Sequence, residues 1–229
     1  MVLNYTSGLP NWASGPLVFD ASPGTKWRYS GEGFVLLQRA VEAVTGEPLD
    51  RYMAHQLFAP LAMDNSAYLS NAHLRPQLLA GTKANGAPRS TIDIKHPVAA
   101  FSLHTTAADY GKFIAALLND EPILKQLGAS PVMVDAGLNL RWGLGWGVGQ
   151  AGDDAYIWQW GNNPGYRAFV MLSVRTGDGF VMRTNSENGL AMAQPLAQII
   201  LPGEHKLFEA PMLEDDVLNL LLKNFHVCL

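Results

Sequence analysis

Two short segments of this sequence carry residue types that suit the binding and polarisation of an acyl group. The first is Tyr29-Ser30-Gly31, which places a phenol and a hydroxyl side by side. The second runs from Trp160 through Gly161, Asn162, Asn163, Pro164 and Gly165 to Tyr166. Together they are typical of the two walls of an acyl-transfer pocket.

The sequence offers no nucleophile motif to accompany these walls. In one common arrangement, Ser-x-x-Lys, the serine attacks the substrate and the lysine three residues later serves as its base. The residues three positions before the seven lysines are Pro23, Ala80, Ile92, Asp109, Pro122, Gly203 and Leu220, and none of them is Ser, Thr or Cys. We therefore expect this chain on its own to be unable to form an acyl-enzyme.

Composition and charge indicate one folded domain and disfavour nucleic acid and membrane as partners. The 229 residues are 48% hydrophobic and 16% charged, which suits one domain with a large core. The net charge of -4 is spread without long runs, so nucleic acid is not an expected partner. No stretch is long enough for a membrane span, and residues 1–6 lack the features of a signal peptide. The single cysteine, Cys228, leaves the compartment undetermined.

The sequence predicts neither a cofactor nor a metal. Glycines alternate with large residues from Gly143 to Gly149, which is typical of strand and not of a nucleotide-binding loop. The six histidines have no zinc-ligand spacing. No Gly-x-Ser-x-Gly motif occurs either, which disfavours an α/β-hydrolase.

Helix signals dominate the first part of the chain. Apolar residues recur at helical spacing from Glu32, with Ser30 as the N-cap and Gly46 as the stop. We expect a short second helix capped by Asp50, and a third that begins after Thr106 and is followed by one more turn after Pro122. Residues 81–104 have no sustained period and predict a long surface excursion that shapes a pocket rim.

Strand signals dominate the second part. We expect strands at 142–149, 156–160, 166–174 and 180–184, with a hairpin turn at 176–179. A helix over about 189–200 should follow them, and Val217 to Phe225 should form an amphipathic helix in the tail.

The order of several motifs resembles that of the β-lactamase-related serine hydrolase family, which includes class C β-lactamases, penicillin-binding DD-peptidases and related esterases. The motifs are Thr6-Ser7-Gly8-Leu9-Pro10, Pro23-Gly24-x-x-x-x-Tyr29-Ser30, Leu57-Phe58-x-Pro60-Leu61-x-Met63 and Asn163-Pro164-Gly165-Tyr166. The resemblance covers residues 3 to 200. It implies an α+β fold with an antiparallel sheet packed by helices, a partial β-lactamase-related domain over 1–201 that lacks its N-terminal part, and a tail over 202–229.

The resemblance also implies roles for individual residues. Tyr29 matches the catalytic tyrosine that assists proton transfer, and Ser30 matches its neighbour. Gly31 stands where many relatives carry an asparagine that contacts the substrate amide. In the second segment, Gln159-Trp160-Gly161 falls on the Lys-Thr-Gly strand, where the neutral Gln159 supplies no positive charge, and Asn162 offers an oxyanion-hole N–H. The expected site residues are Tyr29 as catalytic residue and Ser30, Gly31, Gln159, Trp160, Gly161, Asn162 and Asn163 as substrate-binding residues.

The implied reaction is acyl transfer to water from a β-lactam, a D-alanyl peptide or an ester. In relatives the nucleophile segment would precede Leu3, so this chain should be inactive unless another chain completes it. Relatives bury part of their sheet and helices against that segment. We therefore expect uncovered apolar side chains after Gly31 and in the 142–148 strand, and with them a homo-oligomer or a complementary partner chain.

Three alternatives remain open at the level of sequence. The chain could be a non-catalytic binding module that keeps the pocket walls. It could be an interaction protein that uses a groove and the 217–225 helix. It could also use Ser30, Ser7 or Ser102 as a nucleophile, although none of these has a lysine or histidine at supporting spacing.

Overall fold

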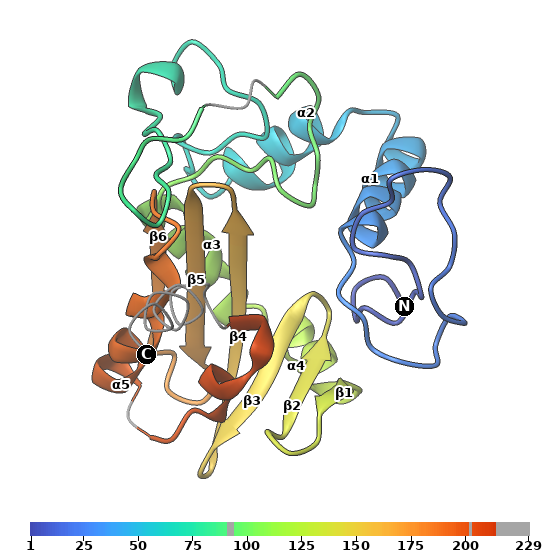
Figure 1. Cartoon of the computed structure of the whole chain (residues 1–229), viewed down its shortest axis with the longest axis vertical. Coiled ribbons are helices and arrows are strands. Elements are labelled where there is room, and N and C mark those ends of the chain that lie inside the picture. The colour runs from blue at the N-terminus through green and yellow to red at the C-terminus, as the bar shows by residue number, and fades with distance from the viewer. Residues whose placement is uncertain (91–93, 202, 214–229) are drawn as a thin grey trace, which may run out of the picture. The chain divides into compact units, whose positions relative to one another are not determined.

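The computed structural model describes residues 1–90, 94–201 and 203–213 (Figure 1). The expected tail helix at 217–225 and Cys228 lie outside these residues. The chain divides into two compact units. Unit 1 comprises Met1–Leu78, Asp93–Val134 and Arg141–Val148, and unit 2 comprises Leu79–Ile92, Asp135–Leu140 and Gly149–Leu229. No helix in the described part of the chain is long and apolar enough to cross a membrane.

Helix α1 (Gly31–Thr45) confirms the predicted boundaries. The Ser30 side chain accepts a hydrogen bond from the Gly33 N–H, and Gly46 ends the helix in the left-handed conformation at φ 72°. Glycine suits this position because it has no Cβ to clash there. The Tyr-Ser-Gly triplet therefore forms the entrance to α1.

A short helix follows, but its predicted cap was wrong. Helix α2 (Leu49–Met53) begins after Pro48, and Asp50 lies inside its first turn. The fixed φ of proline sets the chain direction one residue before the helix, so no side-chain cap is needed. A π-helical turn, η1 (Ala54–Phe58), continues it and ends before Pro60, as predicted. Leu49 and Phe58 are buried with Met63 and Tyr68 in one core cluster.

Two further helices complete the helical part of unit 1. Helix α3 (Ala107–Leu118) is capped by Thr106, whose hydroxyl accepts from the Asp109 N–H at 3.1 Å. Helix α4 (Glu121–Ala129) is capped by Asp120 and carries Pro122 in its first turn. Both helices were predicted. A short 3-10 turn, η2 (Arg75–Gln77), lies earlier in the unit.

The glycine-rich segment forms a hairpin rather than the predicted continuous strand. Strand β2 (Leu140–Gly143) pairs antiparallel with β3 (Trp146–Ala151). Leu144 and Gly145 make the turn at φ 49° and 87°, and two positive φ values in succession suit the twist of a tight hairpin. The expectation of uncovered side chains here was also wrong for Trp142 and Trp146, which are buried. Strand β1 (Val132–Asp135) was not predicted.

The remaining strands match the predictions closely. Strand β4 (Asp154–Asn163) pairs antiparallel with β5 (Tyr166–Ser173), and β5 pairs with β6 (Gly179–Thr184). The hydrogen-bonded order follows the chain from β1 to β6, which confirms the α+β class with an antiparallel sheet. Figure 1 shows β4, β5 and β6 side by side, with α5 (Ala193–Ile200) against β6. Three 3-10 turns complete unit 2: η3 (Gly189–Met192), η4 (Lys206–Glu209) and η5 (Pro211–Leu213).

Candidate acyl-binding site

Tyr29 is held at the entrance to α1 by a second tyrosine, Tyr5. Their ring centroids lie 4.7 Å apart, and the two phenols are hydrogen-bonded to each other. Burial raises the pKa of Tyr29, and the bond with Tyr5 offsets this only in part. Tyr29 is therefore a neutral phenol near pH 7 that holds its proton more tightly than an exposed tyrosine does.

Tyr5 lies at the centre of an aromatic cluster that fixes this pair. Its ring packs against Trp27, Phe34 and Trp142 at centroid distances of 5.8, 5.5 and 5.2 Å. Tyr5 is 4% exposed, and burial raises the pKa of its phenol above the ordinary value. Tyr5 was not identified from the sequence, although it directly precedes the motif Thr6-Ser7-Gly8-Leu9-Pro10.

The hydroxyl of Ser30 is fully used by local structure. It accepts from the Gly33 N–H at 2.9 Å and donates to the Pro10 carbonyl at 2.7 Å, in a side chain that is 1% exposed. Ser30 thus starts the helix and ties the N-terminal loop to it. Its expected role in substrate binding stays a prediction.

Gly31 lies where a side chain would not fit. Its N–H donates to the Asn11 side-chain oxygen at 3.0 Å. A Cβ at this position would lie 2.7 Å from the Trp12 ring and 3.0 Å from the Asn11 carbonyl oxygen. The N-terminal loop occupies the space that a side chain at position 31 would need. The expected substrate contact of Gly31 stays a prediction.

The second predicted set lies in unit 2, along the last residues of β4. Gln159, Trp160 and Gly161 are partly exposed, and the Gln159 side chain accepts from the Trp160 N–H at 2.9 Å. Asn162 is exposed and stands opposite Arg167 in β5, and Asn163 stands opposite Tyr166. The structure thus brings these five predicted residues together on one strand end, and their substrate contacts stay predictions.

A cavity of about 330 Å³ adjoins this strand end within unit 2. Its most connected residue is Glu187, whose carboxylate accepts from Arg89 Nε at 2.6 Å, the Gly165 N–H at 3.2 Å and the Ala84 N–H at 3.3 Å. Burial pushes the pKa of Glu187 up, but Arg89 and the two backbone donors outweigh it and hold the pKa below its usual range. The cavity is lined by Ala84, Arg89, Asn162, Pro164, Arg167, Glu187 and Asn188.

The segment 79–89 lines part of this cavity. It overlaps the stretch 81–104, which was predicted to shape a pocket rim. Gly81 and Gly165 meet backbone to backbone, since a Cβ on either would lie 2.9 Å from the other's Cα. The Tyr166 hydroxyl donates to the Leu79 carbonyl at 2.8 Å, and the Thr82 N–H donates to the Asn185 carbonyl at 2.8 Å. The turn after β4 is thereby fixed from a segment about 80 residues earlier. Arg89 and Glu187 were not identified from sequence, because only the fold brings them together.

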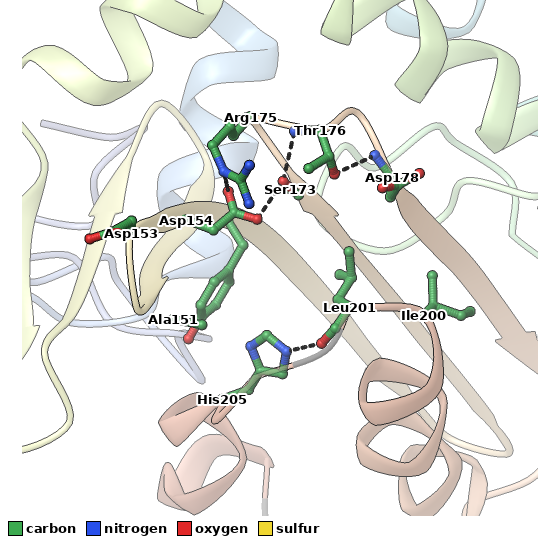
Figure 2. Close-up of a pocket in the computed structure, with 11 residues that line it drawn as sticks. Ala151, Asp153, Asp154, Ser173, Arg175, Thr176, Asp178, Ile200, Leu201 and His205 are labelled. Carbon is green, nitrogen blue, oxygen red and sulfur yellow. Dashed lines mark hydrogen bonds and ion pairs between the residues drawn. The ribbon is translucent and has the colours of Figure 1, made fainter.

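A second cavity of unit 2, of about 340 Å³, contains no predicted site residue (Figure 2). Ser173 donates to Asp154 at 2.6 Å and accepts from the Thr176 N–H at 3.0 Å, and Figure 2 shows Arg175 beside Asp154. His205 lies at the other side and bonds to the Leu201 carbonyl at 2.5 Å. The cavity is lined by Asp154 and Tyr156 at the start of β4, whereas the predicted residues begin at Gln159, three residues or about 10 Å further along the strand.

The predicted residues belong to two units. Tyr29 in unit 1 carries a phenol, and Asn162 and Asn163 in unit 2 carry backbone and side-chain amide groups. Among the described residues, no group of three or more His, Cys, Asp or Glu side chains is placed to hold a metal ion.

Comparison with known proteins places this architecture in a family. The family described as Beta-lactamase matches residues 1–203. A D-stereospecific amidohydrolase from Streptomyces sp. has a TM-score of 0.71 at 17% identity, over 89% of this chain and 72% of that chain. A D-amino acid amidase from Ochrobactrum anthropi SV3, complexed with D-phenylalanine, has a TM-score of 0.65 at 21% identity, over 81% and 70%. These two likenesses show the fold.

Sequence relatives match over shorter segments. An N-acetylmuramyl-L-alanine amidase from Bacillus subtilis (strain 168) is 35% identical over 74 residues, which is 32% of this chain and 17% of that protein. The matched segments span 16% to 21% of the length of four curated relatives. The family match nevertheless covers most of this chain, and the chain belongs to the beta-lactamase family of serine hydrolases.

Proposed function

We propose that this domain binds small acyl compounds of the β-lactam, D-alanyl peptide or ester class, and positions them for acyl transfer to water. We further propose that the chain alone does not complete this reaction. The observation that carries the proposal is the phenol of Tyr29, fixed by Tyr5 at the entrance to α1 and kept neutral by burial.

Two of the predicted residues have a specific role in this scheme. Tyr29 would assist proton transfer between the attacking hydroxyl and the departing group, as its match to the family's tyrosine implies. The Asn162 N–H would bind the oxygen that becomes negative when the acyl carbon is attacked. The attacking hydroxyl and its base would come from a Ser-x-x-Lys segment, which these 229 residues do not contain.

Three serines of unit 1 that could have served as the nucleophile are poorly placed for that role. Ser30 and Ser102 are each 1% exposed, and Ser7 is 7% exposed. The Ser102 hydroxyl accepts from the Val98 N–H at 2.8 Å, and that of Ser7 accepts from the Leu9 N–H at 3.3 Å. A nucleophile must reach the substrate and lie against a base, and these three hydroxyls are buried in local backbone bonds.

The relatives suggest the kind of bond involved. One solved relative is an amidase complexed with D-phenylalanine, and one curated relative is an N-acetylmuramyl-L-alanine amidase. Carried to this chain as a proposal, these names favour compounds with an amide bond next to an amino-acid residue.

Binding and covalent labelling can be measured on the same preparation. We expect D-phenylalaninamide to bind in a calorimetric titration, and the Tyr29→Phe variant to bind it more weakly. We also expect the intact mass to stay unchanged after incubation with a fluorescent penicillin or a fluorophosphonate. No binding would refute the proposed pocket, and stoichiometric acylation would refute the claim that the chain alone is incompetent.

A second candidate function is that of a non-catalytic binding module. It is favoured by the same observation, that no lysine in this sequence has a Ser, Thr or Cys three positions before it. The two candidates differ when the missing group is supplied. We expect turnover of a nitrophenyl ester once a peptide segment with a family Ser-x-x-Lys is added in trans. Binding without any such rescue would favour the module.

A further inference from the structure

Trp12 is a large aromatic side chain that is half exposed, at 51%, yet held firmly in place. The residues on both sides of it are bonded to the start of α1. Asn11 accepts through its side chain from the Gly31 N–H and through its carbonyl from the Glu32 N–H, both at 3.0 Å. The Ala13 N–H donates to the Glu32 carboxylate at 3.0 Å. These three bonds fasten the Trp12 backbone to the helix entrance.

The ring of Trp12 lies directly against Gly31. Two of its carbons are 2.7 and 2.9 Å from the point where a Cβ on Gly31 would lie. Those distances are too short for a Cβ on residue 31, so the Trp12 ring can occupy this position only because residue 31 is glycine. The indole therefore occupies the direction in which a side chain at position 31 would point, two residues after Tyr29.

A second exposed aromatic ring, Phe101, lies beside Trp12. The two ring centroids are 5.9 Å apart at an interplanar angle of 73°, an edge-to-face contact, and Phe101 is 37% exposed. Its segment is also bonded to α1: the Gln38 side chain donates to the Pro97 carbonyl at 2.9 Å and accepts from the Ala99 N–H at 2.8 Å. Two loops distant in sequence thus hold an aromatic pair on one helix.

We propose that Trp12, together with Phe101, is a specificity-determining surface that contacts an aromatic or bulky apolar substituent of the acyl substrate. The inference rests on the proposed function, which places the acyl group beside Tyr29. Three features favour it: the rings are exposed where a substrate side chain could cover them, their backbones are already fixed, and they lie next to the triplet. Because these groups are already fixed before binding, less conformational entropy is lost when the ligand binds.

A matched pair of ligands tests the proposal. N-phenylacetyl-D-alaninamide and N-acetyl-D-alaninamide differ only by the phenyl ring, and their dissociation constants can be compared by calorimetry. We expect the wild-type chain to bind the phenyl ligand about tenfold more tightly, since a ring packed on an indole gains both burial and edge contacts. In Trp12→Ala this preference should fall to about twofold or less, with the acetyl ligand affected little.

The control is Phe19→Ala, which removes an exposed aromatic side chain from the same N-terminal segment, at 61% exposure. It should keep the preference, and Trp12→Phe should keep part of it. Circular dichroism of each variant checks that it has folded. A wild-type preference absent from the start, or one that survives Trp12→Ala, would overturn this inference and leave the proposed function standing. Failure of both ligands to bind the wild-type chain would overturn the proposed function together with this inference.

Discussion

The phenols of Tyr5 and Tyr29 are hydrogen-bonded to each other, with their ring centroids 4.7 Å apart. The two residues are unequal partners, because Tyr5 is 4% exposed whereas Tyr29 is partly exposed. Loss of the bond therefore has different consequences at its two ends.

We expect Tyr29→Phe to lower the free energy of unfolding by about 1–3 kcal/mol, because it leaves the buried Tyr5 hydroxyl without its partner. Tyr5→Phe removes the same bond, but the more accessible Tyr29 hydroxyl can turn to water, so the loss should be about 1 kcal/mol or less. Urea unfolding of both variants measures the difference. Equal losses, or a larger one for Tyr5→Phe, would show that the pair is not arranged as described.

Stability should fall in alkaline solution. Burial raises the pKa of Tyr5 and Tyr29, and raises the pKa of Tyr68 and Tyr156 to about 12. A phenol with a raised pKa keeps its proton more tightly when folded. Its contribution is therefore intact below the unfolded value of about 10 and is lost as the pH rises through the folded value. Thermal unfolding between pH 8 and 12 checks this, and a melting temperature unchanged across about that range would contradict it.

Asp109 should make the fold sensitive to acid. Burial alone raises the pKa of Asp109, but hydrogen bonds from Lys112, the Asn65 N–H and Ser66 outweigh it and lower that pKa. A carboxylate with a lowered pKa stabilises the fold above its unfolded value of about 4, and this is lost as the pH falls through the folded value.

We expect Asp109→Asn to cost about 1–3 kcal/mol at pH 7 and much less at pH 2. Oδ2 of Asp109 accepts from the Asn65 N–H at 2.7 Å and Oδ1 accepts from Lys112 at 3.0 Å, and the NH2 group of an asparagine cannot accept at either position. Unfolding measured at both pH values is the check. A loss that is the same at the two pH values would mean that the charge of Asp109 does not matter.

The meeting of Gly81 and Gly165 should be sensitive to a single methyl group. Gly165 has φ 83° and a Cβ there would lie 2.9 Å from the Gly81 Cα, so Gly165→Ala should cost about 3 kcal/mol or more from strain and clash. Gly177 is the matched control, with φ 76° and open space around its Cβ position. Gly177→Ala should cost only about 1 kcal/mol. Similar losses would mean that segment 79–89 does not touch the turn.

Assembly is also expected from the apolar surface of unit 1. Leu36 and Val44 on α1 are 47% and 87% exposed, and Leu17, Val18 and Phe19 are exposed in the N-terminal loop. Exposed apolar patches are commonly covered by a partner. Light scattering at micromolar concentration should therefore show self-association, or a shift on adding a complementary segment. A monodisperse monomer that binds no apolar dye would refute the expectation.

Local patterns predicted most of the elements. Ser30, Gly46 and Thr106 marked helix ends because caps act through neighbouring backbone atoms. The strands at β4, β5 and β6 followed from alternation and turn residues. The turn at Leu144-Gly145 was missed because its alternating large and small residues also suit a continuous strand.

The candidate site was less visible in the sequence. Motif order predicted Tyr29 and the end of β4 as site residues, but the residues that hold them in place come from far along the chain. Tyr5 reaches Tyr29 across 24 positions, and Glu187 reaches Arg89 across 98. Such pairings depend on tertiary packing, which no local period encodes. Trp12 and Gly31 are a similar case. The Trp12 ring fits against α1 because Gly31 has no side chain, and this relation becomes visible only in the folded structure.

The most direct test of the central claim is a titration with D-phenylalaninamide, followed by intact mass analysis of the same chain after exposure to a fluorescent penicillin. We predict saturable binding that weakens in Tyr29→Phe, together with a mass that stays at that of the unmodified chain. Absence of binding, or a covalent acyl adduct on any serine, would contradict it.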